Sequence, residues 1–272
     1  MVNTLQATRA IRHPCFDEDA HDSVGRVHLP VARFCNIHCN FCERNVCASN
    51  AIHHPGWTAK VISVTEAVEL VHLITRSKPT KDFVVGVAGP GDALANEETF
   101  MVMELLQQEY PEILKCVSTN GLLLQDRLPY LIKAGIKAIT VTINAPDPVV
   151  GKNIYSWVKY KGTIYHDVEA ATLLIEKQFR GIMEALDAGL SVKANAVLIP
   201  GVNDGHMINL ALRLRKAGVK LMNIMPLIPS GKMKNNPAPT CDELQKIRRE
   251  CEIIIPQFHR CEQCRADLIY LL

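Results

Sequence analysis

Residues 28–47 read HLPVARFCNIHCNFCERNVC and contain four of the ten cysteines of this chain. Three of them, Cys35, Cys39 and Cys42, form a C-x3-C-x2-C pattern directly after a short apolar run that is typical of a strand. Thiolates this close together in a loop repel one another unless a cation shares their charge. A metal ion or an iron–sulfur centre is therefore the expected occupant of this loop.

The number of ligands distinguishes the two kinds of centre. A structural zinc site takes four ligands, usually from paired C-x2-C knuckles. A cubane has four irons that each take a ligand, so three thiolates leave one iron open. The spacing thus favours a [4Fe-4S] cluster, with a zinc site or a chance group of buried thiols as the alternatives.

The cysteine loop, with the aromatic Phe41 before its third cysteine, resembles the loop of the radical S-adenosylmethionine (SAM) enzymes. The resemblance implies that the open iron is chelated by the amino and carboxylate groups of the methionine part of SAM. It also makes Cys35, Cys39 and Cys42 the ligands of the catalytic cluster.

Length and composition fit one large domain, since α/β barrels fill the range of 272 residues. A net charge of +2, with no basic run interleaved with aromatics, argues against a nucleic-acid partner. No segment approaches the roughly 18 apolar residues that span a bilayer, and the N-terminus has no apolar signal core. We therefore expect a cytoplasmic protein whose cysteines serve metal rather than disulfides.

A pattern of alternating strands and helices fills most of the chain. Strands are predicted from residue 26 to the cysteine loop and at 83–88, 115–119, 138–143, 191–198 and 220–225. Helices are predicted at 65–76 (capped by Thr65), 97–108, 126–134, 167–188 and 204–217. Apolar strands that are each followed by a helix indicate a parallel sheet buried on both faces. Six such units match the partial (β/α)6 TIM-like barrel of the radical SAM type.

The remaining segments extend this α/β barrel at both ends. Residues 1–24 are predicted to form an N-terminal arm that contributes cluster ligands, and 25–230 the radical SAM partial barrel. Residues 231–272 are predicted to form a C-terminal helix and a C-x2-C tail that closes the barrel mouth.

Polar or glycine-rich residues stand where the apolar runs end. The carboxyl ends of parallel strands meet at one rim, where the site of such a barrel lies. Glycine lets a backbone approach a ligand closely, so the GPGD loop at 89–92 is expected to bind the methionine end of SAM. The segment 197–204 resembles the one that packs against the adenine. The predicted cofactor-binding residues are Gly89, Gly91, Asp92, Asn120, Asn144, Asn195 and Val197.

Several longer motifs are more specific than the cysteine loop. They are HPC (13–15), HLPVA (28–32), GPGDALAN (89–96), STNGL (118–122), TVTINAPDP (140–148), KANAVLIPGVND (193–204), NIMPLIP (223–229) and CEQCRAD (261–267). Together they resemble the family of nitrogenase iron–molybdenum cofactor maturases, in a short form without the C-terminal carrier domain.

The resemblance implies a lyase or transferase of nitrogen fixation that carries the SAM cluster and two further four-iron clusters. These two are fused into an eight-iron, carbide-containing core through SAM-derived methyl transfer and hydrogen abstraction by the 5′-deoxyadenosyl radical. The implied partners are SAM, iron–sulfur cluster donors and a downstream cofactor carrier or scaffold protein. A monomer is expected.

The other cysteines supply candidate ligands for the two further clusters, namely Cys15, Cys47, Cys116, Cys261 and Cys264. Five thiolates are fewer than the eight that two fully ligated cubanes need. Neutral imidazole is the expected supplement, and His28 and His13 are the candidates. Cys241 and Cys251 are left out, because they lie on a predicted helix where buried free thiols are common.

Two other functions fit the same residues. One is a radical SAM maturase of another substrate, in which Cys261 and Cys264 hold auxiliary clusters only. The other is a non-catalytic iron–sulfur carrier, which would not bind SAM.

Overall fold

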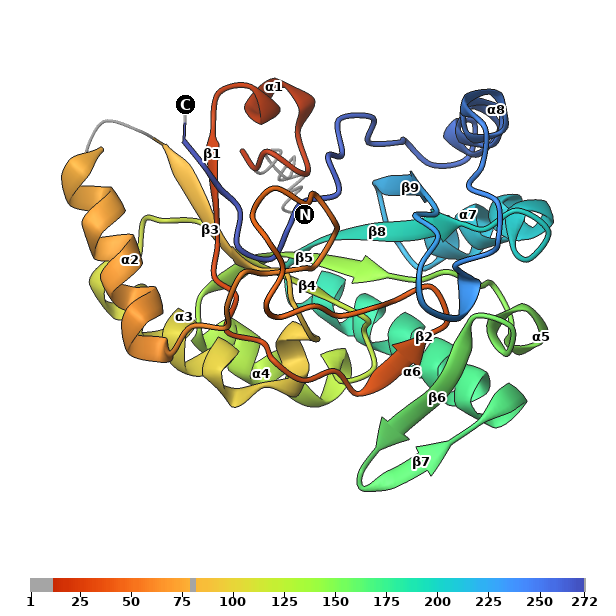
Figure 1. Ribbon diagram of the computed structural model, residues 1–272, viewed down its shortest axis with the longest axis horizontal. Helices are drawn as coiled ribbons and strands as arrows, with labels where there is room; N and C mark the ends of the chain where they lie inside the picture. The colour runs from red at the N-terminus through yellow and green to blue at the C-terminus, as the bar shows by residue number, and fades with distance from the viewer. Residues whose placement is uncertain (1–11, 79–81, 272) are drawn as a thin grey trace, which may run out of the picture.

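The computed structural model describes residues 12–78 and 82–271. Its main sheet has seven strands in the order β10-β1-β3-β4-β5-β8-β9. These strands are β1 (Gly25–His28), β3 (Phe83–Val87), β4 (Lys115–Thr119), β5 (Ile136–Thr142), β8 (Ser191–Leu198), β9 (Met222–Pro226) and β10 (Ile269–Tyr270). All pairs are parallel except β1 with β10. The curved sheet in Figure 1 confirms the predicted partial barrel of six parallel strands.

Helices follow the strands and cover the outer face of the sheet. The longer ones are α2 (Val64–Ser77), α3 (Glu97–Glu109), α4 (Leu124–Lys133), α6 (Asp167–Asp187), α7 (Met207–Lys216) and α8 (Cys241–Glu252). The short ones are α1 (Glu18–His21), α5 (Pro148–Gly151), η1 (Ala93–Ala95), η2 (Asp204–His206) and η3 (Gly231–Met233). In Figure 1, α3, α4 and α6 lie along one face of the sheet, and residues 12–24 of the N-terminal arm and the C-terminal tail lie on the other. None of the described helices is long and apolar enough to cross a membrane.

The two faces of the sheet differ in polarity. Successive strand residues point to opposite faces, and one set packs with the helices in the main core, including Val85, Val117, Ile139 and Val192. The register aligns His28 with Gly86 and Gly86 with Cys116, and it aligns Thr140 with Lys193. The inner face therefore carries polar and thiol side chains, namely Arg26, His28, Cys116, Ser118, Thr140, Lys193, Asn195 and Asn223.

The C-terminal tail connects the two edges of the half-barrel. Met222 of β9 donates to Pro256 O and accepts from Phe258 N. At the other edge, β10 pairs with β1, and His28 N donates to Leu268 O. The tail therefore crosses the open side of the barrel over the polar inner face.

A second, antiparallel sheet of β2 (Ile37–Cys39), β6 (Tyr155–Tyr160) and β7 (Thr163–Tyr165) holds the cysteine loop. The hairpin β6–β7 was not predicted from the sequence, although its two-residue turn has a signature. Lys161 and Gly162 both adopt positive φ (48° and 85°), as a type I′ hairpin turn requires. Figure 1 shows this hairpin projecting beside α6.

Two predicted details are wrong, both for local reasons. The cap of α2 is Ser63 rather than Thr65, because Ser63 and Glu66 form a reciprocal capping box. The predicted helix at 204–217 begins as a separate 3-10 turn, η2, before α7. On α8, Cys251 is buried as expected, whereas Cys241 is exposed at the first position.

Lys115 is fully buried at the start of β4, and its Nζ donates to Tyr110 O (3.0 Å) and Ile113 O (2.9 Å). Burial lowers the pKa of this ammonium to about 8, although the Glu112 carboxylate opposes the change. The ammonium thus closes the connection between α3 and β4 by satisfying two carbonyls.

We expect the Lys115→Met variant to change how stability depends on pH. Between pH 8 and 10.5 the unfolded chain holds a proton on this lysine that the folded chain has lost. The free energy of unfolding of the natural chain should therefore rise across this window, by roughly 3 kcal/mol from this group. Urea unfolding should show no such rise in the free energy of unfolding of Lys115→Met. The control is Lys220→Met, which changes an exposed lysine and should retain the rise. Parallel pH profiles for all three chains would contradict the assignment.

Candidate functional site

Backbone hydrogen bonds hold the cysteine loop, residues 33–42, against the GPGD loop that follows β3. Phe34 O accepts from Asp92 N and from Asn96 Nδ2, both at 2.8 Å, and Phe34 N donates to Asn96 Oδ1 at 2.9 Å. Gly91 N donates to Ala32 O at 2.6 Å. Protein contacts therefore fix the position of the cysteine loop by themselves.

Gly91 allows these two loops to touch. A Cβ at this position would lie 2.1 Å from Phe34 O and 2.4 Å from Phe34 C, so a side chain would force the backbones apart. Gly89 has φ +139°, where side chains other than glycine are strained. The predicted contact of Gly91 is with SAM, but its close approach in the structure is to the backbone of Phe34.

The thiols of Cys35, Cys39 and Cys42 are partly buried and lie within range of one another's charges. Burial raises the pKa of all three, that of Cys35 to about 12, and the charges of neighbouring thiolates raise the pKa of Cys39 further. Arg44 is the cation that lowers the pKa of each thiol. Such thiols ionise together only when a bound cation takes up their charge, which fits an iron–sulfur cluster.

The arrangement of these thiols differs from a site for a single ion. Among residues 12–78 and 82–271, no three His, Cys, Asp or Glu side chains lie close enough together to bind one metal ion. A cubane has a different requirement, because each thiolate binds a separate iron of the cluster.

The buried carboxylate of Asp92 links the GPGD loop to the end of β4 by hydrogen bonds. It accepts from Thr119 Oγ1 (2.9 Å), Asn120 N (2.5 Å) and Leu94 N (3.0 Å). Burial raises the pKa of this carboxyl, although these hydrogen bonds oppose the rise. The protein thus occupies much of the accepting capacity of a residue that was predicted to bind SAM.

Asn120 and Asn144 also join neighbouring elements at the rim. Asn120 Nδ2 donates to Asn36 Oδ1 (2.6 Å) and lies 3.7 Å from Cys35 Sγ. Asn144 Oδ1 accepts from Val197 N (2.9 Å), which connects the ends of β5 and β8. These contacts place both asparagines at the carboxyl ends of the strands, beside the cysteine loop in the case of Asn120.

The rim retains buried polar atoms without a partner. Asn195 Oδ1 accepts from Asn223 Nδ2 (3.1 Å), but Asn223 Oδ1 has no partner among the described residues. Asn36 Nδ2, beside Asn120, is likewise buried without one. Since a buried polar group needs a hydrogen bond, these atoms fit a polar ligand such as SAM at this rim.

A second group of thiols lies on the inner face of the barrel, beneath the arm and the tail. Cys116 of β4 points into it, and the absence of a side chain at Gly86 makes room, since a Cβ there would lie 2.7 Å from Cys116 Sγ. These thiols lie within range of one another's charges. In addition to burial, the charge of Cys15 raises the pKa of Cys116 and Cys264, and the charge of Cys261 raises the pKa of Cys15 and Cys264. The structure thus brings together four of the five predicted auxiliary ligands.

Two cations to which the sequence analysis gave no site role border this second group. The guanidinium of Arg26 lies 3.8 Å from Cys264 Sγ and pairs with Glu262 at 2.8 Å. Lys193 Nζ donates to Cys15 O at 2.8 Å. The sequence could have indicated their direction, because residues two positions apart in a strand point to the same face. Arg26 therefore shares a face with His28, and Lys193 shares one with Asn195.

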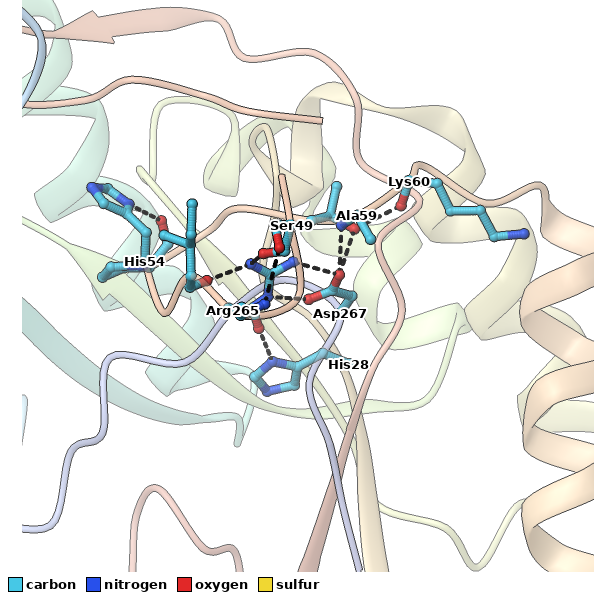
Figure 2. A network of polar contacts seen from close by, with 11 residues as sticks. His28, Ser49, His54, Ala59, Lys60, Arg265 and Asp267 are labelled. Carbon is cyan, nitrogen blue, oxygen red and sulfur yellow. Dashed lines mark hydrogen bonds and ion pairs between the residues drawn. The ribbon is translucent and has the colours of Figure 1, made fainter. Parts of the chain in front are cut away.

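The fifth predicted ligand, Cys47, is exposed on the loop 45–58. Arg265 of the CRAD motif fastens this loop to the tail by donating to Ser49 O (3.1 Å) and Ile52 O (2.6 Å). Arg265 also binds Asp267, whose carboxylate accepts from Ala59 N at 2.6 Å (Figure 2). The position of Cys47 relative to the inner thiols therefore depends on this network.

The two candidate histidines differ in which ring nitrogen is free. His28 Nδ1 donates to Arg265 O at 2.9 Å (Figure 2), so its proton is on Nδ1 and Nε2 keeps its lone pair. His13 Nδ1 accepts from Cys15 N at 2.9 Å, and burial lowers the pKa of its imidazole to about 3. A neutral His13 therefore carries its proton on Nε2 and has no free lone pair in this conformation. The free Nε2 lone pair of His28 suits metal ligation, whereas ligation by His13 stays a prediction.

Comparisons with known proteins identify the class first. Residues 29–214 match the Radical SAM superfamily, so the chain is a member of that superfamily. SuiB of Streptococcus suis, solved with S-adenosylmethionine bound, has a similar fold at a TM-score of 0.61 and 9% identity, over 90% of this chain and 56% of its own. A radical SAM methyltransferase of Sphaerobacter thermophilus aligns at 0.56 and 20% identity, over 87% and 65%.

Within that superfamily, the relatives define a narrower family. The FeMo cofactor biosynthesis protein NifB of Methanocaldococcus jannaschii is 45% identical over 96% of this chain and 86% of its own. NifB of Chlorobaculum tepidum is 40% identical, over 96% and 62%, and that of Klebsiella pneumoniae is 38% identical, over 100% and 59%. The chain belongs to the NifB family.

Gly91→Ala tests the contact between the two loops. The added Cβ overlaps backbone atoms, so we expect a loss of about 1–3 kcal/mol in the free energy of unfolding. Urea unfolding measures this loss, and the iron bound by the cysteine loop should fall with it. Gly205→Ala is the control, because a Cβ there meets nothing within 4 Å. A Gly91→Ala chain as stable as Gly205→Ala would contradict the packing.

Asp267→Asn tests the joint between the tail and the 45–58 loop. Burial alone would raise the pKa of Asp267, but hydrogen bonds from Arg265 and Ala59 lower it overall. Its stabilisation should be present above the ordinary carboxyl pKa and lost as pH falls through the lowered value. At neutral pH we expect Asp267→Asn to lose about 1–3 kcal/mol in urea unfolding.

The difference between Asp267→Asn and the natural chain should narrow below about pH 4. The exposed Asp187 gives the matched control, Asp187→Asn, which should follow the natural chain at every pH. A difference that stays constant into acid would show that the Asp267 carboxylate charge is not the stabilising feature.

Proposed function

We propose that this protein is a radical SAM enzyme of FeMo cofactor assembly. It fuses two [4Fe-4S] clusters into an eight-iron, carbide-containing core, with SAM-derived methyl transfer and hydrogen abstraction by a 5′-deoxyadenosyl radical. The observation that carries the proposal is the presence of two separate thiol groups in one half-barrel. One group lies in the cysteine loop at the rim, and the other lies on the inner face.

The cysteine loop is the proposed site of the catalytic cluster, held by Cys35, Cys39 and Cys42. When bound, this cluster supplies the electron that cleaves SAM. The protein supports it by fixing the loop through Gly91 and Asp92, so that the three thiols keep their spacing. The cofactor carries the difficult chemistry, and the protein orients it and excludes water.

The rim beside the cysteine loop is the proposed SAM site. Asn120 lies next to Cys35, and Asn144 and Val197 link the neighbouring strand ends. Gly89 of the GPGD loop and Asn195 complete the set on the same rim. The unpartnered polar atoms of Asn36 and Asn223 support a polar ligand here.

The inner thiols, Cys15, Cys116, Cys261 and Cys264, are the proposed ligands of the two substrate clusters. His28 joins them through its free Nε2, and Cys47 is proposed to reach them from the 45–58 loop. Scattered ligands from the arm, one strand and the tail suit units that must leave the site after fusion. Iron–sulfur cluster donors and an acceptor of the product are the partners that this function requires.

The proposal predicts both products and iron content. Anaerobically reconstituted natural chain with dithionite and SAM should release 5′-deoxyadenosine and S-adenosylhomocysteine, and it should hold about twelve irons because three cubanes have four each. Replacing Cys35, Cys39 and Cys42 with alanine should abolish SAM cleavage and leave about eight irons. Replacing Cys261 and Cys264 should do the reverse. Cys241→Ala, outside both groups, is the control.

Each alternative function gives a different result in the same experiment. Release of neither product overturns the proposal, and iron binding without SAM binding would indicate a non-catalytic carrier. About four irons with SAM cleavage would indicate a radical SAM enzyme of another substrate. Loss of all iron in both cysteine variants would show that the two groups form one shared site.

A further inference from the structure

Lys193 is a buried cation in the middle of the inner face. Its side chain comes from β8 and is only 2% exposed. The ammonium lies over the rings of Phe16 (5.3 Å) and Phe258 (4.8 Å), and Nζ donates to Cys15 O (2.8 Å). Residues of the arm and the tail therefore cover it from two sides.

No carboxylate neutralises this charge among the residues that the structure describes. No Asp or Glu oxygen lies within 4.0 Å of Lys193 Nζ, whereas the equally buried Arg26 has Glu262 at 2.8 Å. Burying a charge without a counter-charge is strongly unfavourable. Two cation–π contacts and one carbonyl do not supply a negative charge, but Cys15 and Cys116 would supply it once they ionise as cluster ligands.

The surroundings indicate where this negative charge would lie. Burial raises the pKa of the thiols of Cys15 and Cys116, which lie on different elements, and the charge of Lys193 lowers it. Arg26 lies 3.8 Å from Cys264 Sγ, and its charge also lowers the pKa of Cys15. An iron–sulfur core among these thiols takes them as thiolate ligands, and these thiolates place negative charge beside the two cations.

We propose that Lys193, together with Arg26, forms a cationic site that holds net-negative iron–sulfur units between Cys15 and Cys116. This inference rests on the proposed function and adds a positioning role for residues that are not themselves iron ligands. A four-iron core in its reduced state carries one positive charge, so two or three thiolate ligands make each unit a net anion, and two such units repel each other. Buried positive charge between them lowers this repulsion and lets them approach before fusion.

A positive charge at this distance has a second consequence, for the reduction potential. Net charge and hydrogen bonds near an iron–sulfur cluster set its potential. Removal of the Lys193 ammonium should make the auxiliary clusters harder to reduce. A purely structural lysine would affect stability without moving the potential.

The test compares Lys193→Met, Lys193→Arg and the natural chain after anaerobic reconstitution. Lys193→Met should release its auxiliary iron to a chelator at least about tenfold faster, as loss of a buried charge partner implies. Its auxiliary clusters should titrate at a lower potential, read by electron paramagnetic resonance in the background where Cys35, Cys39 and Cys42 are alanine. Lys193→Arg should restore both properties.

Lys115→Met is the matched control, because it also removes a fully buried lysine but lies outside the thiol group. It should leave iron release and potential unchanged, and melting curves confirm that each variant is folded. Lys193→Met with the release rate and potential of the natural chain would overturn the inference. A natural chain without auxiliary iron would instead overturn the proposed function, and this inference with it.

Discussion

The open side of the half-barrel is the constraint on which the rest of the structure depends. Six parallel strands leave two edges and an inner face uncovered, and this inner face carries thiols and cations instead of a hydrophobic core. The tail meets this constraint by hydrogen bonding to β9 at Met222 and to β1 through β10. Its cysteines lie over the inner face as a direct result. The same segment of the tail thus covers the sheet and brings Cys261 and Cys264 to the second thiol group.

The cysteine loop is positioned by a different principle, namely contact between two loop backbones. The absence of a side chain at Gly91 and the buried carboxylate of Asp92 add to the pairing of β2 with β6 and to the apolar packing of Ile37. Such contacts are rigid, because shifting one loop breaks hydrogen bonds in the other. Residues that look like ligands of a cofactor in the sequence therefore also build the frame around it.

Sequence periodicity predicted the parallel strands well, because apolar runs such as 191–198 are long and end in clear turn residues. It missed the β6–β7 hairpin, because these short antiparallel strands interrupt the alternation of strand and helix on which the prediction relied, although β6 is rich in Tyr, Trp and Val. Motif spacing identified the thiols, but only the folded chain shows that Cys15, Cys116, Cys261 and Cys264 meet. Lys193 and Arg26 were given no role because a lone basic residue in a strand has no distinguishing pattern until its burial is known.

The two thiol groups differ in fixed charge, and the proposed function explains why. Near Cys35, Cys39 and Cys42 the nearby cation is the exposed Arg44, which lowers the pKa of the thiols. The buried carboxyl of Asp92 has the opposite effect and, like burial, raises the pKa of Cys35 and Cys39. SAM is itself a sulfonium cation, so its binding brings positive charge to this cluster. In the proposed function the inner group receives no cationic cosubstrate and binds units that its thiolates make net negative. At both sites a positive charge must balance the thiolates. The sulfonium of SAM supplies it at the first site, and the buried Lys193 and Arg26 supply it at the second.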